Sequence, residues 1–460
     1  MNKKLKSSFF TGLMVLLMIA VVTGACSSNS NNGNANTNAE KPVSSQTETP
    51  TSDENSPKEE EPALGLEPAE IVIHSSSGWT EEAFNARYGD KIREKFPQHN
   101  ITYIQHGNGV NYNSLIAGGT EIDIYWESVA QFSNALQVEM QYDMTDLISQ
   151  HKVDTSKIEP TMMEAMKSIS NGGMYALPVL NNTMSLYYNK DLFDRFGVDY
   201  PTDGMSWDDI LKLNRQLTRV VDDKQYAGLG FVFGHLLRMN PFSLPYVDAE
   251  TDKVTLNDYE FWRTLYDTFI IRTAQAPGYQ DYLREKNNFP GVANFVKDQD
   301  VAMIAAVANT HLNFDMSHFN WDLIGLPEFS AAPGVGPQLY PTYWGVSTVS
   351  TSKAQSMEII KYLVSDEYQT EVAKSGALPV VTSDAVIESY GQDTNFTDKN
   401  IRSAFYDNPA AISPKSAYDT KVEALFRKNI LPLALGETDL NTEFRVAEEA
   451  ANKLIEELKQ

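Results

Sequence analysis

The sequence is short of several features that direct a functional interpretation, and cysteine is the first. Cys26 is the only cysteine among 460 residues, so the chain cannot form an internal disulfide. Basic residues are also scarce: 37 lysines and arginines face 61 acidic residues, which gives a formal net charge of −24. Nucleic-acid binding and adhesion to an anionic membrane surface both depend on clustered Lys and Arg. The composition therefore argues against both partners and is silent about a neutral ligand.

Motifs of catalysis are also missing from the sequence. We find no Gly-x-Ser-x-Gly nucleophile elbow, no phosphate loop, no His-Glu-x-x-His zinc motif and no EF-hand loop. His311 has no metal-binding partner at ligand spacing, so we interpret it as a structural residue. The sequence therefore predicts no catalytic residues, no cofactor and no metal site. With 61 carboxylates, chance pairs are certain, and counting does not decide against a glycosidase.

Residues 1–25 have the pattern of an export signal. Three early lysines precede a short apolar core, Phe9 to Val22, which is too short for a secure membrane span. The segment ends in Thr23-Gly24-Ala25-Cys26, which resembles a bacterial lipoprotein processing site. We therefore expect a lipoprotein signal peptide, with Cys26 as the lipidation site that anchors the protein to the cell membrane. A cleaved secretory signal followed by an incidental cysteine is the alternative.

Residues 26–68 contain almost no large apolar side chains and are rich in Ser, Asn, Thr, Glu and Pro. Such a stretch cannot bury enough apolar surface to offset the entropy of ordering it. We therefore predict a disordered tether. A flexible coil of this length spans roughly 35–40 Å, enough to hold a globular body away from a membrane.

The remaining residues, 69–460, are too many for one ordinary core and suggest two lobes. Glu70 to His74 is typical of a buried strand, and a loop of small residues leads from it to a helix that begins near Thr80. Open α/β sheets bind ligands at such strand ends. We therefore expect Ser76, Ser77 and Trp79 to contact a ligand. Packing of Trp79 against the helix fits equally well.

A third strand, Ile122 to Glu127, ends in an aromatic residue and an acid. Trp126 offers a flat apolar face and an N–H donor, and Glu127 offers two acceptor oxygens. That pair suits a sugar, which presents an apolar C–H face and a rim of hydroxyl groups. The alternatives are core packing for Trp126 and a solvated turn for Glu127.

Tyr175 to Asp191 is the stretch around which we organise the chain. Pro178 interrupts an apolar run, and Met184 to Tyr188 is a short segment rich in residues that favour strands. The chain either passes here from one lobe to another or forms an ordinary strand-loop-strand within one sheet. The pattern alone does not separate these two interpretations.

A resemblance separates them. Leu177-Pro178, the segment Leu186 to Phe193 and Trp207-Asp208-Asp209-Ile210 are similar to the signature of extracellular solute-binding proteins of ABC importers. The branch is the one that includes the maltose-binding protein, and Phe295 to Ile304 resembles its second landmark. The resemblance covers about residues 70–460. It implies an α/β fold with two lobes, of the type II periplasmic-binding-protein kind, joined by a hinge.

The resemblance also implies site residues. Asn182 falls where the family commonly has a ligand-facing polar residue, with a turn-capping asparagine as the alternative. Asn309 falls at the implied second crossover and is a candidate ligand contact, although many relatives have a glycine and an aromatic residue where this chain has Ala308-Asn309. That difference removes an aromatic side chain on which a sugar could stack, so the resemblance does not identify the solute. Tyr343 and Trp344, on a return strand, are candidates for a ligand wall, with packing as the alternative. We assign Trp207 to structure.

The implied crossovers lie near residues 180, 308 and 345. Lobe 1 would then hold residues 69–180 and 309–345, including a strand at 319–327, and lobe 2 would hold 181–308 and 346–460. The expected protein is a monomeric, lipid-anchored extracytoplasmic receptor without enzymatic activity. It would deliver a solute, a sugar or oligosaccharide, to an ABC permease whose ATPase works on the other side of the membrane. A surface-anchored glycoside-active enzyme and a structural surface lipoprotein are the alternatives.

Overall fold

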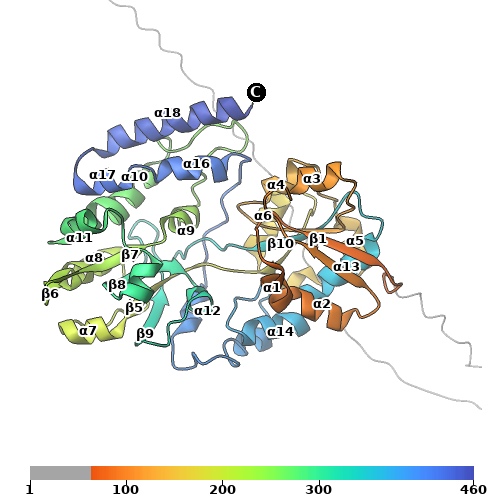
Figure 1. The fold of residues 1–460 in the computed structure, drawn as a ribbon, viewed down its shortest axis with the longest axis horizontal. Helices are drawn as coiled ribbons and strands as arrows, with labels where there is room; N and C mark the ends of the chain where they lie inside the picture. The colour runs from red at the N-terminus through yellow and green to blue at the C-terminus, as the bar shows by residue number, and fades with distance from the viewer. Residues whose placement is uncertain (1–63, 460) are drawn as a thin grey trace, which may run out of the picture. The chain divides into compact units, whose positions relative to one another are not determined.

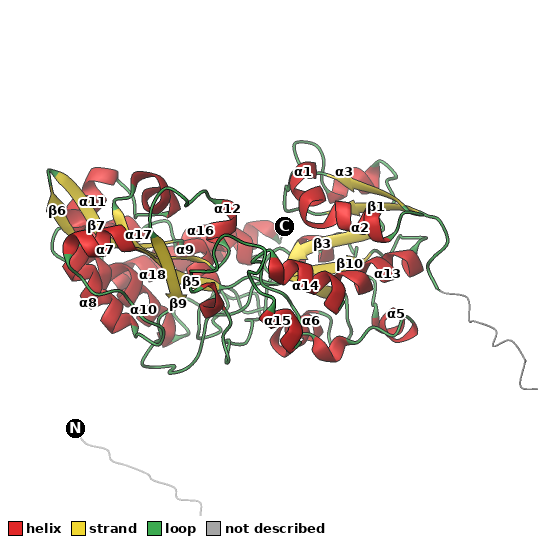
Figure 2. Cartoon of the chain, turned by 90° about the horizontal axis from the view of Figure 1, so that it is seen from below, coloured by secondary structure: helices red, strands yellow, loops and turns green. Residues whose placement is uncertain are grey.

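The computed structural model describes residues 64–459, and its strands form two five-stranded sheets with helices on both sides (Figures 1 and 2). The fold class is α/β, as predicted. The predicted signal peptide, Cys26 and almost all of the predicted tether lie outside the described residues. Within residues 64–459, none of the helices combines the length and apolar character needed to cross a membrane.

The first sheet has the strand order β2-β1-β3-β10-β4. Its strands are β1 (Glu70–His74), β2 (Asn100–Ile104), β3 (Ile124–Ser128), β4 (Leu177–Leu180) and β10 (Thr342–Val346). β1 pairs in parallel with β2 and β3, whereas β10 runs antiparallel between β3 and β4. A strand from late in the chain therefore fills a central position in a sheet that begins at residue 70.

The second sheet has the strand order β6-β7-β8-β5-β9. Its strands are β5 (Met184–Asn189), β6 (Arg219–Val221), β7 (Lys224–Phe231), β8 (Val301–Val307) and β9 (Trp321–Gly325). β5 is antiparallel to both β8 and β9, and β7 is parallel to β8. β5 is buried along its whole length, which explains why four of its six residues, MSLYYN, are apolar or aromatic.

Short helices surround the first sheet. They are α1 (Glu81–Phe84), the π-helical η1 (Asn85–Gly89), α2 (Asp90–Lys95), α3 (Tyr112–Ala117), α4 (Ser133–Leu136), α5 (Thr145–Gln150), η2 (Thr155–Lys157), α6 (Pro160–Ile169), α13 (Lys353–Leu363), α14 (Asp366–Lys374) and α15 (Asp384–Glu388). α13 packs on β10, β4 and α5. In Figure 1, α13 and α14, in blue, lie beside the orange elements from the start of the fold.

The other helices follow or cover the second sheet. They are α7 (Lys190–Phe196), α8 (Trp207–Leu217), α9 (Phe233–Arg238), α10 (Glu260–Tyr266), η3 (Asp267–Arg272), α11 (Tyr279–Lys286), η4 (Asn294–Asp298), α12 (Thr310–Asn313), η5 (Ile401–Ala404), α16 (Asp419–Phe426), α17 (Ile430–Leu435) and α18 (Leu440–Leu458). Asn189 caps α7 through its side chain, as the sequence predicts. Trp207 is buried against Phe269 at a ring separation of 4.8 Å, in the predicted structural role.

The passage of the chain between the sheets corrects part of the sequence prediction. The first connection, 181–183, joins β4 to β5 near the predicted position. No crossover occurs near 308, because β8 and β9 both pair with β5, and the strand predicted at 319–327 lies in the second sheet. The second connection is instead 326–341, and the third follows α15, since η5 packs against β9.

The predicted lobe ranges are therefore wrong where they place β9 in lobe 1 and α13 in lobe 2. Two physical facts explain the errors. A strand pattern does not name its pairing partner, and α13 returns to the strand that directly precedes it. For the rest of the chain, the predicted division into two lobes stays a prediction.

Candidate functional site

A cavity of about 900 Å³ is bordered by segments of both sheets. This volume falls within the range of ordinary small-molecule sites. Its lining consists of Trp79, Thr80, Ala83, Ala86, Arg87, Lys91, Leu180, Asn182, His235, Val307, Asn309, Leu312, Asn313, Tyr340, Tyr368, Glu371, Val372, Ser375 and Ala377. Three residues predicted from sequence are thus brought together here: Trp79, Asn182 and Asn309.

Trp79 follows the loop after β1 and precedes α1, whose N-terminus Thr80 caps. Its half-buried indole lies 6.0 Å from the Tyr88 ring in a stacked arrangement and meets Trp126 edge-on at 5.3 Å. The guanidinium of Arg87 lies over the ring, 5.1 Å from its centre. Tyr103 also holds the Trp79 backbone by donating a hydrogen bond to its carbonyl oxygen at 3.0 Å. Trp79 is therefore a well-supported aromatic side chain at the cavity wall.

The loop that carries Trp79 is held by a buried carboxylate. Glu127, which is fully buried, accepts hydrogen bonds of 2.7 Å from the Ser76 backbone N–H, the Ser76 hydroxyl and the Tyr112 hydroxyl. Asn134 donates to the Ser76 oxygen at 2.9 Å. Ser76, Ser77 and Glu127 do not line the cavity; Glu127 is buried, and the two serines are half-buried.

Burial governs the charge state of Glu127. Loss of hydration raises the pKa of its carboxyl group to about 7, although three hydrogen bonds from Ser76 and Tyr112 oppose that rise. Within residues 64–459, no ion pair reaches this carboxylate. Glu127 thus holds the Trp79 loop through a carboxyl group that can be protonated near neutral pH. In this structure it is neither in a solvated turn nor at the cavity wall, the two positions considered from the sequence.

Three aromatic residues predicted as ligand walls are core residues in this structure. Trp126, Tyr343 and Trp344 are at most 2% exposed, and none lines the cavity. Trp126 and Trp344 are partners across β3 and β10 and stack at 6.2 Å, and Tyr88 covers Trp344 at 4.9 Å. Tyr343 points to the other face, where its hydroxyl donates to the Met162 carbonyl at 2.6 Å. The prediction of direct contact is corrected because the helix layers cover both faces of β10.

The two predicted asparagines come from the second-sheet side of the cavity. Asn182 lies in the connection between β4 and β5, where its side-chain oxygen accepts from the Thr183 backbone N–H at 2.9 Å. Asn309 follows β8, and its side-chain oxygen accepts from Asn313 at 3.3 Å. Both are half-buried. Each amide therefore offers donors to the cavity, the chemistry that hydroxyl groups need.

Sequence reasoning missed the cluster around Tyr340. Tyr340 lies in the second connection between the sheets, and its hydroxyl accepts from Arg238 at 2.9 Å and donates to Ser128 at 3.2 Å. His235 meets the Tyr340 ring edge-on at 5.8 Å. Burial, followed by the charges of Arg238 and Arg427, lowers the pKa of His235 to about 4, so it is neutral at pH 7. The sequence alone gave no reason to assign any single residue of this cluster to the cavity.

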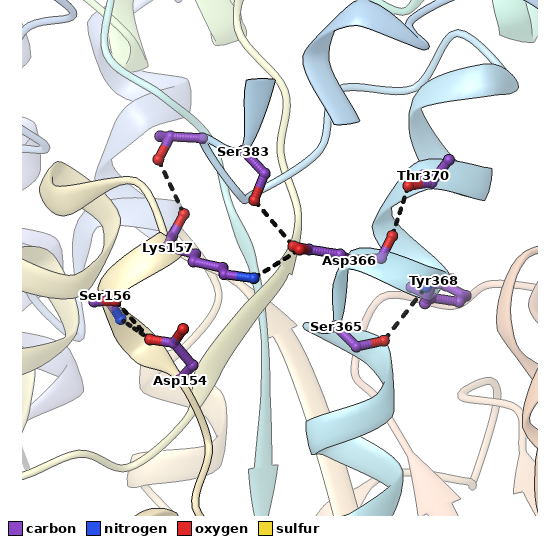
Figure 3. A network of polar contacts seen from close by, with 9 residues as sticks. Asp154, Ser156, Lys157, Ser365, Asp366, Tyr368, Thr370 and Ser383 are labelled. Carbon is purple, nitrogen blue, oxygen red and sulfur yellow. Dashed lines mark hydrogen bonds and ion pairs between the residues drawn. The ribbon is translucent and has the colours of Figure 1, made fainter. Parts of the chain in front are cut away.

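α14 forms another wall of the cavity with Tyr368, Glu371 and Val372. A polar network fixes its N-terminus (Figure 3): Asp366 accepts from Lys157 at 2.7 Å and from Ser383 at 3.0 Å. At the cavity side, the Tyr368 hydroxyl donates to the Arg87 carbonyl at 2.8 Å. Contacts at both places hold α14 against the elements around the first sheet.

The described residues hold no group of His, Cys, Asp and Glu side chains that could bind a metal ion. His311 is buried and lies 2.9 Å from the Tyr187 hydroxyl through its Nδ1 atom. Burial lowers its pKa to about 4. The side chains that line the cavity offer aromatic rings for stacking and polar groups for hydrogen bonding.

Solved structures share this fold across most of the chain. A sugar transporter from Rhizobium etli in an open conformation has a TM-score of 0.65 at 18% identity, covering 83% of this chain and 99% of its own. An ABC substrate-binding protein from Listeria monocytogenes in complex with cycloalternan has a TM-score of 0.64 at 16% identity, covering 85% and 99%. At such identities the likeness establishes the fold, which is the two-lobed periplasmic-binding-protein type.

A solute-binding protein of an ABC transporter from Thermotoga lettingae, bound to α-D-tagatose, is similar in the same way. Its TM-score is 0.61 at 16% identity, covering 84% of this chain and 99% of its own. The family of bacterial extracellular solute-binding proteins matches residues 75–370. That span is more than half of the chain, and it includes the Trp79 loop and both asparagines. This protein therefore belongs to the bacterial extracellular solute-binding proteins, in the maltose-binding-protein-like family to which its sequence pointed.

Proposed function

We propose that this protein binds a sugar or oligosaccharide in the cavity and delivers it to the permease of an ABC importer. One observation carries the proposal: the Trp79 indole and the side chains of Asn182 and Asn309 line a single cavity of about 900 Å³. An indole face stacks on the C–H face of a pyranose, and amide groups bond its hydroxyl groups. The sugars bound by the solved structures of similar fold, cycloalternan and α-D-tagatose, favour the same class of solute.

The contact set that we propose differs from the sequence prediction. Trp79, Asn182 and Asn309 remain in it, and Tyr340 and Arg87 join it. Ser76, Ser77 and Glu127 act through the loop that positions Trp79, and Trp126 supports the Trp79 ring from behind. Closure of the two lobes on the solute would follow from a higher affinity of the closed state.

We propose that the protein performs no catalytic step on its solute. Glycoside hydrolysis generally uses two carboxyl groups that flank the bond to be broken. Of the residues that line the cavity, only Glu371 carries a carboxylate, and it is paired with Lys91 at 3.0 Å. The family and the similar structures are binding proteins, which supports the same conclusion.

Anchoring and assembly remain proposals from the sequence. Thr23-Gly24-Ala25-Cys26 supports lipidation of Cys26, and the polar tether supports a monomeric receptor held outside the cell membrane. Labelling with a fatty-acid analogue, with Cys26→Ser as the control, tests the anchor. Unchanged labelling of that variant would refute the proposed lipidation site.

Calorimetric titration with a panel of mono- and oligosaccharides tests the solute class. We expect a sugar to bind, and we expect Trp79→Ala and Asn182→Ala each to weaken it at least about tenfold, since each removes a contact of about 1.4 kcal/mol or more. Tyr259→Ala is a matched aromatic control, because Tyr259 is 42% exposed and does not line the cavity. Binding of no sugar would refute the proposal, and release of reducing sugar would favour the enzyme.

A further inference from the structure

The charge balance of the cavity is opposite to that of the chain. The protein has a formal net charge of −24. The ionisable side chains that line the cavity are Arg87, Lys91, Glu371 and the neutral His235. Lys91 and Glu371 pair with each other at 3.0 Å, which leaves Arg87 as the uncompensated charge. A positive cavity in so acidic a protein is a local feature that the overall composition does not predict.

Arg87 is held at the wall without an acceptor for its N–H groups. It lies on η1, and its backbone carbonyl accepts the Tyr368 hydroxyl at 2.8 Å. Among the residues that the structure describes, its guanidinium makes no hydrogen bond or ion pair and contacts the Trp79 ring at 5.1 Å. A guanidinium has five N–H donors and no acceptor capacity. Its donors therefore remain free for a group in the cavity, beside the indole on which we propose the sugar stacks.

The opposite wall adds to the positive potential. Behind Tyr340 and His235, two arginines share one carboxylate: Arg238 donates to Glu423 through Nε at 3.1 Å, and Arg427 donates to it through Nη2 at 3.2 Å. Glu423 is 5% exposed, so water screens this group weakly. The excess positive charge thus lies on both sides of the cavity.

We propose that the solute is an acidic oligosaccharide and that Arg87 recognises the carboxylate of a uronic acid residue. This inference rests on the proposed function, since it names the class of sugar that the same cavity takes. The planar guanidinium matches a carboxylate with two parallel hydrogen bonds, a geometry that a neutral hydroxymethyl group cannot reproduce. Trp79 would hold the sugar ring while Arg87 selects its charged substituent.

Pairs of oligouronates and their methyl esters test the inference, because esterification removes the charge and keeps the sugar skeleton. We would titrate the purified protein with oligomers of galacturonate, glucuronate and mannuronate, each as acid and as ester. For the pair that binds best, we expect the acid to bind about 10- to 100-fold more tightly. Raising NaCl from about 0.05 to about 0.5 M should weaken binding of the acid more than that of the ester.

Variants assign the preference to Arg87. Arg87→Gln should remove the preference for the acid over its ester, and Arg87→Lys should retain part of that preference. Arg215→Gln, at an exposed arginine that does not line the cavity, removes the same charge and should keep the preference. Circular dichroism would confirm that each variant is folded.

The outcomes separate the two proposals. If neutral saccharides or esters bind as tightly as the acids, the inference about Arg87 fails and the proposed sugar-binding function stands. If Arg87→Gln keeps the full preference for the acid, another residue recognises the carboxylate of the sugar and the assignment to Arg87 is wrong. If no saccharide binds, acidic or neutral, both proposals fall.

Discussion

Replacing Glu127 by glutamine should remove one contribution to the pH dependence of folding stability. Glu127 is fully buried, and burial raises its pKa to about 7, above the ordinary value of 4.5. Between these two values the folded state keeps a proton that the unfolded state has released. Folding is therefore favoured by protonation, and the free energy of unfolding falls as pH rises through this window.

The size of the effect follows from the two pKa values. Their separation corresponds to about 3 kcal/mol of stability that is fully present below pH 4.5 and lost above about pH 7. Glutamine cannot titrate, so this loss should disappear. Asp419 contributes a change of the same sign, because burial raises its pKa to about 6. His235 and His311 contribute the opposite sign, because burial lowers their pKa to about 4. The effect of Glu127 is therefore measured as the difference between the variant and parent profiles.

Glutamine also suits the geometry. One oxygen of Glu127 accepts from the Ser76 N–H and the Tyr112 hydroxyl, and the other accepts from the Ser76 hydroxyl. A glutamine oxygen can take the first position, and its amide can donate to the Ser76 oxygen once that hydroxyl turns. Glu127→Ala, in contrast, leaves buried donors unpaired and should cost about 2 kcal/mol or more at every pH.

Urea unfolding followed by tryptophan fluorescence, at several pH values between 4.5 and 8, would measure the effect. Glu82→Gln is the matched control, since Glu82 is exposed in the first turn of α1. Its profile should superimpose on that of the parent protein. A parent-like slope in Glu127→Gln would show that this carboxyl group does not carry the pH dependence.

Three further predictions concern packing and surface charge. Gly345→Ala should lower the free energy of unfolding by about 1–3 kcal/mol, because its Cβ would lie 2.4 Å from the Tyr125 ring, whereas Gly107→Ala, with open space, should be near neutral in the same denaturation assay. Tyr340→Phe removes the hydroxyl between Arg238 and Ser128 and should lower the free energy of unfolding by about 1 kcal/mol, seen as a lower urea midpoint with an unchanged slope; an unchanged midpoint would show that these hydrogen bonds do not stabilise the fold. Lys157→Ala should leave the urea midpoint nearly unchanged, because both members of its ion pair with Asp366 are nearly half exposed, and a clear fall of the midpoint in about 0.5 M salt would contradict this interpretation.

The two-lobed architecture and the first connection were predicted because the sequence resembles the solute-binding family, since the local pattern of proline and strand-forming residues fits a crossover and a single sheet equally well. The sequence does not predict the sheet to which β9 belongs, since pairing between β5 and β9 joins residues more than a hundred positions apart. Asn182 and Asn309 were placed by resemblance, and both line the cavity. Their contact with a solute stays a prediction.

The aromatic residues show where sequence patterns lose information. Trp79 lies in the loop after β1 and lines the cavity, whereas Trp126 lies within β3 and is buried. The difference arises because η1 brings Tyr88 over Trp126 and Trp344, an arrangement that no local pattern contains. Arg87 and Tyr340 were missed for a related reason: their roles depend on neighbours that are distant in the chain.

The position of β10 has a consequence for how the newly exported polypeptide matures. Every strand of the second sheet comes from the uninterrupted stretch 184–325, so that half has all of its own hydrogen-bonding partners early. In the first sheet, β3 and β4 have no strand between them until residues 342–346 form β10. If the chain crosses the membrane from its N-terminus, β1 to β4 emerge well before β10. Until β10 pairs with β3 and β4, those two strands expose unpaired edges, which a chaperone outside the membrane would have to protect from aggregation.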